Sequence, residues 1–181
     1  DGRTWVIDPQ SVDVSPLFQA LAESELLVHS GQQDLAILFR ESNTPALQVF
    51  DVQIAAGFCG HGHPTRLDAL VSNILGTKID KGPTLSDWSK RPLSPTQIAY
   101  AASDVRVLFP LREEITRLLN INDRLHWAEE DSQQLAKTVA AGPQVRHVWT
   151  SWDIVSRLDD TTQNILGVLF HWRDQQGRQK N

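Results

Sequence analysis

The sequence predicts an α/β layer fold, and three observations carry this prediction. Short apolar runs typical of strands alternate with helical segments between residues 4 and 50. The run Leu26–His29 is apolar at each of its first three positions and too short for a helix, as in a buried parallel strand. The length of 181 residues suits one domain, or one domain with part of a second. Strand–helix–strand alternation favours parallel pairing of the strands.

The first elements are predicted from residues that typically end a strand or begin a helix. Thr4–Ile7 is a β-type run that Asp8-Pro9 stops. Ser15 is the expected N-cap, with Pro16 at the first position, of a helix over Leu17–Glu23.

A buried strand over Leu26–His29 is followed by Ser30 and Gln33, which have the spacing of a capping box. We expect this box to open a helix from Gln32 to about Arg40. A further strand spans Ala46–Phe50 and ends at Asp51.

The chain becomes helical after Asp51. A short helical piece covers Gln53–Phe58, and an amphipathic helix covers Arg66–Leu75, closed by Gly76. The segment between Lys78 and Pro92 is irregular.

Ser94, Pro95 and Gln97 form the strongest helix start, and that helix runs through Tyr100 and Asp104. We expect Pro110 to kink it or to end its first section. Helical segments continue through Leu119 and from Leu125 to Val139.

The stretch Ala140–Pro143 contains the clearest linker signal, Ala-Ala-Gly-Pro. We therefore predict one domain over residues 1–140, a linker over 141–144, and the start of a helical domain with two helices over 145–181.

The composition limits the class of protein. Seventeen Lys and Arg against 22 Asp and Glu give a net charge of −5, which argues against a surface that coats DNA. It does not exclude nucleic acid as a substrate, because metal ions can join an acidic site to phosphate. Apolar runs are too short for a membrane span, and the single cysteine suits a reducing cytosol. We expect a cytoplasmic protein without membrane contact.

Tyr100 and Asp104 lie four residues apart on one helix, so their side chains share a face. The pair suits a carboxylate ligand with a phenol beside it, although a solvent-facing Asp near a half-buried Tyr is the commoner arrangement. Asp34 lies in the first turn of a helix that follows a buried strand, where capping and a role in a site are equally good explanations. Asp51 is expected to N-cap the next helix.

Other polar residues carry weaker signals. His29, Ser30 and Asp34 are too close in sequence for a hydrolase triad. His61 and His63 lack further metal ligands nearby, and Cys59 is expected in the core. The basic segment from Lys78 to Arg91 contains Trp88, and cations around an aromatic ring suit a phosphate backbone and a stacked base. A solvated loop held by one buried Trp explains it equally well.

Five segments in this order resemble bacterial ribonuclease D, a 3′–5′ exoribonuclease family of the DEDDy group. They are His29–Leu35, Phe50–Gln53, Asp80–Gly82, Asp87–Ser94 and Tyr100–Asp104. The resemblance covers about residues 4–140.

The resemblance implies an RNase H-like three-layer α/β/α exonuclease domain with two divalent ions, Mg²⁺ or Mn²⁺. Asp34 and Asp104 would be metal ligands, and Tyr100 would orient the attacking water. Oxygen ligands suit such hard cations. The expected nucleic-acid contacts are His29, Lys81, Trp88 and Arg91.

The sequence departs from the family in one respect. The family's first motif, Asp-x-Glu, supplies the other two acidic ligands, and no Asp-x-Glu occurs in these 181 residues. We therefore expect an incomplete exonuclease domain without its first strands. The segment Leu169–Asp174 resembles the start of the helical HRDC domain, of which only a stub is present.

These features predict an exoribonuclease that trims RNA 3′ ends, such as those of tRNA precursors, by two-metal hydrolysis. Two alternatives stay open: a nucleic-acid-binding or scaffold protein without catalysis on the same fold, and a DNA 3′–5′ exonuclease.

Overall fold

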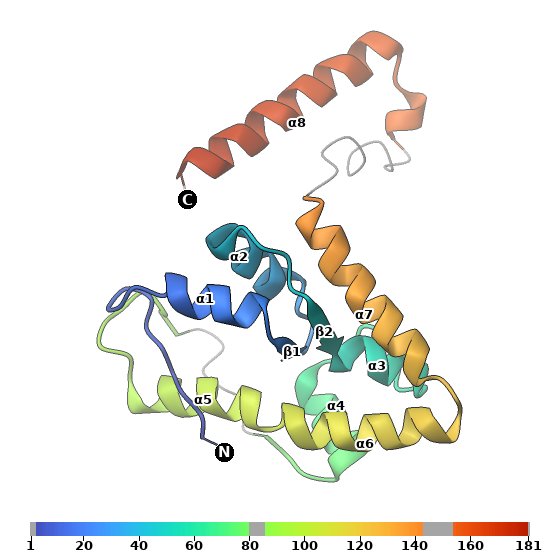
Figure 1. Cartoon of the computed structure of the whole chain (residues 1–181). Helices are drawn as coiled ribbons and strands as arrows, with labels where there is room; N and C mark the ends of the chain where they lie inside the picture. Colours follow the sequence, from blue (N-terminus) through green and yellow to red (C-terminus); the bar gives the residue numbers. More distant parts are fainter. Residues whose placement is uncertain (1–2, 80–85, 143–153, 181) are drawn as a thin grey trace. The chain divides into compact units, whose positions relative to one another are not determined.

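The computed structural model describes residues 3–79, 86–142 and 154–180. It divides the chain into two compact units, Asp1–Ala140 and Ala141–Asn181, which are treated separately below (Figure 1). Part of the predicted linker at 141–144 lies outside the described residues.

The first unit is built on two parallel strands. β1 (Glu25–Val28) pairs with β2 (Gln48–Asp51) in a register that places Glu25 beside Gln48 and Val28 beside Asp51. The crossover between them is α2 (Gln32–Ser42). The predicted parallel pairing is confirmed, with strand boundaries one or two residues from those expected.

One face of these strands packs against three helices. Leu26, Val28 and Val49 point into a core that is closed by α1 (Ser15–Ala22), α2 and α7 (Leu125–Ala140). The small buried side chains Ala22 and Ala136 allow these helices to approach closely.

The opposite face carries the larger core. Leu27 and Phe50 lie in a cluster with α3 (Val52–Phe58), α4 (Leu67–Leu75) and α6 (Leu108–Ile121). Successive strand residues thus point to opposite cores, as the pleat requires. Helices lie on both sides of the strands, as expected for the predicted three-layer arrangement (Figure 1).

The helix that carries Tyr100 and Asp104 is α5 (Pro95–Arg106). Its predicted capping box is present: the Ser94 hydroxyl accepts from the Gln97 N–H, and the Gln97 side chain accepts from the Ser94 N–H. The α5 helix ends at Arg106 and α6 starts at Leu108, so the chain breaks just before Pro110, as predicted.

The strand predicted over Thr4–Ile7 is wrong. Residues 3–8 follow an irregular path, and Trp5, Val6 and Ile7 are exposed. A strand exists only where a neighbour accepts its backbone hydrogen bonds. Within the residues that the structure describes, β1 and β2 pair with each other alone, so this apolar run pairs with neither strand.

Two predicted N-caps are also wrong, although α2 begins at Gln32, as predicted. Ser30 has a left-handed backbone (φ 57°), and Gly31 rather than Ser30 occupies the N-cap position of α2, without a side-chain cap. Asp51 accepts the hydrogen bonds from the Ser30 and Gly31 N–H groups instead. Ser15 lies inside α1, and its N–H donates to Asp13, whose carboxylate takes the place of the expected hydroxyl cap.

The second unit contains a 3₁₀ turn, Val155–Arg157, and the long helix α8 (Asp160–Lys180). Two helices were predicted in this unit. Its described residues form one long helix and one short 3₁₀ turn. No helix in the described ranges combines the length and the apolar character needed to cross a membrane.

Candidate active site

An open cleft of about 950 Å³ lies where β1 ends. His29 follows β1 directly, Asp34 comes from the first turn of α2, and Tyr100 and Asp104 come from α5. Parallel sheets place ligand sites beyond the carboxyl ends of their strands, because helix N-termini and loops converge there. The cleft therefore unites these four residues, which span 75 positions of the sequence from His29 to Asp104.

Tyr100 and Asp104 lie one turn apart on α5 and both line the cleft. Burial raises the pKa of the Asp104 carboxyl above its ordinary value, while the Tyr100 hydroxyl and the nearby His29 oppose that rise. The pKa of the Tyr100 hydroxyl is also raised, first by burial and then by the Asp104 charge. The phenol consequently stays protonated at neutral pH and can donate a hydrogen bond.

Asp34 presents an exposed carboxylate to the same cleft. Its position depends on the chain turn that connects β1 to α2. Gly31 is essential in this turn, because a Cβ there would lie 2.4 Å from Val28 Cγ2. The turn thus brings the start of α2 against the end of β1.

Asp51 fixes this turn from the neighbouring strand. Its carboxylate oxygens accept from Ser30 N (3.0 Å) and Gly31 N (2.9 Å), and Oδ1 also accepts from Gln53 N (2.8 Å). The last bond makes Asp51 the N-cap of α3, as predicted. Asp51 is 1% exposed and is not among the residues that line the cleft. We infer that Asp51 holds the turn between β1 and α2 and does not bind metal.

His29 and Gln53 converge on one backbone carbonyl. Both His29 Nε2 (2.9 Å) and Gln53 Nε2 (3.0 Å) contact the Thr65 oxygen. A carbonyl can only accept, so His29 donates from Nε2 in this arrangement. These bonds fix the loop before α4 as one wall of the cleft.

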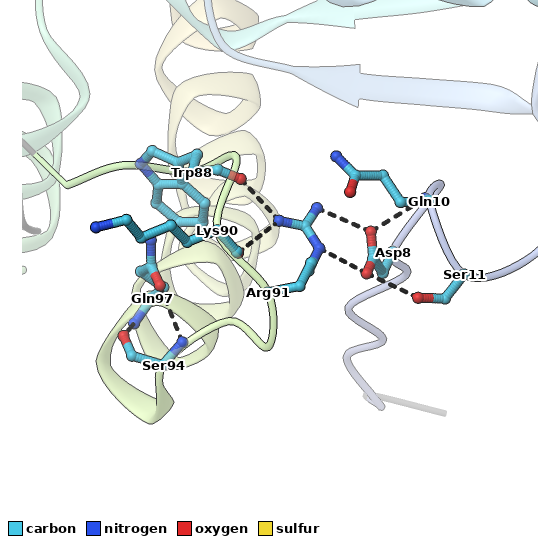
Figure 2. A network of polar contacts seen from close by, with 8 residues as sticks. All are labelled: Asp8, Gln10, Ser11, Trp88, Lys90, Arg91, Ser94 and Gln97. Carbon is cyan, nitrogen blue, oxygen red and sulfur yellow. Dashed lines mark hydrogen bonds and ion pairs between the residues drawn. The ribbon is translucent and has the colours of Figure 1, made fainter.

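The other residues expected to contact nucleic acid have different positions. Trp88 lines the cleft, 41% exposed, with its ring centroid 6.3 Å from that of Tyr100. Lys81 lies outside the described residues. Arg91 is not among the cleft-lining residues, and its guanidinium is bonded to Asp8 and to two backbone carbonyls (Figure 2).

Arg66 and Asp68 also line the cleft, and the sequence analysis did not select them. Arg66 is the only Lys or Arg among the described lining residues, and its guanidinium forks onto Asp68 (3.1 and 3.2 Å). Arg66 lies at the N-cap of α4. This position could have drawn attention to it, because helix N-termini gather around such sites.

The side chains present fit a hard divalent cation in part. Asp34 and Asp104 provide carboxylate oxygens in one cleft, and such oxygens are the ligands that Mg²⁺ and Mn²⁺ prefer. Across residues 3–79, 86–142 and 154–180, no group of three or more His, Cys, Asp and Glu could hold a metal. His61 and His63 thus form no such centre, and Cys59 packs beside the larger core.

The sequence model of a 3′–5′ exonuclease domain matches residues 1–120. The chain belongs to this 3′–5′ exonuclease family. Ribonuclease D of Xanthomonas oryzae pv. oryzae is 39% identical over 155 residues, which are 86% of this chain and 43% of that protein. This exonuclease domain spans less than half the length of the curated relatives it matches.

Solved structures agree on the fold. Escherichia coli RNase D, described as an exoribonuclease involved in structured RNA processing, superposes with a TM-score of 0.76 at 24% identity, over 93% of this chain and 46% of that one. Brucella melitensis NrnC with bound Mg²⁺ gives a TM-score of 0.59 at 28% identity, over 74% of this chain and 65% of that one. The same nuclease bound to pGG gives 0.60 at 29%, with the same coverage. The expected RNase H-like exonuclease fold is therefore confirmed.

Proposed function

We propose that this exonuclease domain belongs to a ribonuclease D-like enzyme that removes nucleotides one by one from RNA 3′ ends. The observation that carries the proposal is the convergence of Asp34, Tyr100 and Asp104 on one cleft. The family match and the ribonuclease D relative support the reaction class. Phosphodiester hydrolysis needs positioned charge and an oriented water, and these three side chains are of the types that supply both.

Asp34 and Asp104 are the residues that would hold divalent metal, Mg²⁺ or Mn²⁺. A site with two ions needs further acidic ligands, which an Asp-x-Glu segment would supply, and these 181 residues contain no Asp-x-Glu. When bound, such ions activate the attacking water and stabilise the leaving 3′ oxygen. The Mg²⁺ bound by Brucella NrnC supports this choice of metal.

The remaining steps fall to the chain's own side chains. The protonated Tyr100 hydroxyl, held beside Asp104, orients the water that attacks the last phosphodiester. Trp88, open to the cleft beside Tyr100, stacks on the terminal base, which is a contact that any base can make.

Two cations serve the phosphates. Arg66 contacts a backbone phosphate, because it is the only permanent cation among the described lining residues. We retain Lys81 as a second phosphate contact on the strength of the family resemblance. His29 assists as a further nucleic-acid contact beside Asp104.

The proposed substrate is a single-stranded RNA 3′ end, with tRNA precursors as the natural source, acted on in the cytoplasm. The bacterial ribonuclease D relatives support RNA and this location. The complex of Brucella NrnC with pGG supports a short single-stranded end as the bound form.

Matched oligonucleotides test the proposal. We join the chain to an Asp-x-Glu strand and supply 5′-labelled RNA and DNA of one sequence with Mg²⁺. Products that shorten stepwise from the RNA 3′ end are expected, and RNA carrying a blocked 3′ terminus should resist. Cleavage inside the strand, or faster loss of the DNA, would contradict the assignment.

A further inference from the structure

The Arg91 guanidinium connects the irregular N-terminal segment to the loop that carries Trp88 (Figure 2). Arg91 Nε and Nη2 donate to the two carboxylate oxygens of Asp8 at 2.7 and 2.8 Å. Arg91 Nη1 donates to the carbonyls of Trp88 (2.8 Å) and Lys90 (2.9 Å). All three guanidinium nitrogens are therefore engaged within the protein.

The Asp8 carboxylate is held in place from its other side. It also accepts from Gln10 N (3.1 Å) and from the Ser11 hydroxyl (2.9 Å). The hydrogen bonds from Arg91 hold the pKa of Asp8 well below its ordinary value, so the pair stays charged at neutral pH. A forked pair of this kind fixes direction as well as distance.

Trp88 is the residue that this arrangement positions. Arg91 holds the Trp88 carbonyl, and Gln97 Nε2 donates to the Asp87 carbonyl, in the peptide group on the other side of Trp88 (3.2 Å). Gln97 itself is fixed in the capping box of α5. The backbone around Trp88 is thus anchored to α5 and to Asp8, while its ring stays open to the cleft beside Tyr100.

We propose that Asp8 and Arg91 are positioning residues that hold Trp88 as the stacking wall for the terminal base of the RNA. The inference rests on the proposed function and assigns Arg91 a role other than direct contact with nucleic acid. A stacking wall held in place before binding loses little freedom when the base arrives. Trp88 therefore contributes its full stacking contact only while the Asp8–Arg91 pair is intact.

Asp8→Asn is the primary test, because it removes the charge and keeps the size of the side chain. Arg91→Lys is the second variant, since an ammonium cannot bond both Asp8 oxygens and both carbonyls. Glu114→Gln is the matched control: it breaks the forked Glu114–Arg117 pair on α6, which is not part of the cleft lining.

Two measurements are made on the 181-residue chain. The first is acrylamide quenching of Trp88 fluorescence, obtained as the difference between each variant and the same variant carrying Trp88→Phe. The second is the affinity for a single-stranded RNA oligonucleotide. We expect both test variants to raise the quenching of Trp88 and to weaken RNA binding about tenfold, within the range of a lost base–aromatic stack.

The double variant Asp8→Asn/Trp88→Ala should bind RNA no more weakly than Trp88→Ala alone, because both changes remove the same contact. Glu114→Gln should alter neither measurement. Unchanged quenching and affinity in Asp8→Asn and Arg91→Lys, or additive losses in the double variant, would overturn the inference. Raised quenching in the two variants would support the positioning role and reject the proposed function if the wild-type chain does not bind RNA and does not trim it when joined to an Asp-x-Glu strand.

Discussion

The Tyr100 hydroxyl and the Asp104 carboxylate lie one turn apart on α5 and line the same cleft, and each acts on the pKa of the other. Their interaction lowers the pKa of Asp104 and raises that of Tyr100. Burial, the larger effect at both groups, raises both pKa values. The raised pKa of Tyr100 keeps the phenol protonated at neutral pH beside the partly buried Asp104 carboxyl.

Asp104→Asn should abolish trimming by a chain joined to an Asp-x-Glu strand, since changes even one layer outside a metal's ligands cost about 10–100-fold. Stability should not fall. The pKa of Asp104 is raised above 3.8 by burial, so its contribution to stability is full below pH 3.8 and is lost as the pH rises through the raised value. At pH 7 the neutral amide should match or exceed wild type in urea unfolding. Activity within threefold of wild type would reject the ligand role.

Tyr100→Phe should reduce turnover by about 10²–10⁴-fold, the usual contribution of a group that positions or transfers a proton. Loss of the Tyr100 hydroxyl, which lowers the pKa of Asp104, also leaves the Asp104 charge less stabilised, so the acid limb of the pH–rate profile should move to higher pH. Metal affinity should hardly change, because the phenol is not expected to be a metal ligand. A shifted metal titration with a normal rate at saturating metal would make Tyr100 a support for the ligands.

Arg66→Ala should weaken RNA binding and flatten its salt dependence by about 0.7 in the slope of log K against log salt, as for one lost phosphate contact on a single strand. The fold should tolerate the change, because the Arg66 side chain is 78% exposed. Arg40→Ala is the control, since Arg40 is similarly exposed on α2 but does not line the cleft. Equal salt slopes for wild type and Arg66→Ala would remove Arg66 from the RNA site.

Gly31→Ala should destabilise the first unit by about 1–3 kcal/mol, the usual cost of overpacking. The added methyl would meet Val28 Cγ2 at 2.4 Å. Gly57→Ala, on α3, is the control, because its Cβ would find only an ordinary contact at 3.4 Å from His63 Cβ. Removing a helical glycine should even add about 0.5–1 kcal/mol. Denaturant unfolding of both variants provides the measurement.

The 181-residue chain alone should show no significant exonuclease activity, and joining it to a segment with Asp-x-Glu should restore it. Asp34 and Asp104 can hold at most one weakly bound cation. In the part that the structure describes, β1 pairs only with β2, so a strand edge stays available for self-association. Light scattering and a trimming assay check both points. Robust Mg²⁺-dependent trimming by a monodisperse sample of this chain would contradict the expectation.

Most helices could be predicted because their signals are local. The capping box at Ser94 and Gln97, and the break before Pro110, depend on residues within one turn of each other. Parallel pairing followed from the alternation of short apolar runs with helices. The strand expected at Thr4–Ile7 failed for a different reason: its formation depends on a partner strand, and local sequence does not encode whether one is beside it.

The candidate site shows the same division. Asp34, Tyr100 and Asp104 could be selected from spacing and family resemblance, and the cleft brings them together. The bonds from the Ser30 and Gly31 N–H groups to Asp51, 20 residues beyond Gly31, could not be derived, because a distant carboxylate holds the turn where a local hydroxyl cap was expected. The partner of Arg91 was equally hidden, since Asp8 lies 83 positions away.

The bond from Asp51 N to the Ser132 hydroxyl (3.1 Å) has a consequence for the order in which the protein forms on the ribosome. The end of β2 obtains this partner only after another 81 residues have been synthesised. Until α7 emerges, the nascent β1–α2–β2 segment lacks one wall of its smaller core. Contacts between distant residues form late and leave apolar surface exposed in the meantime. Protease resistance of stalled nascent chains should therefore appear only once α7 has left the exit tunnel.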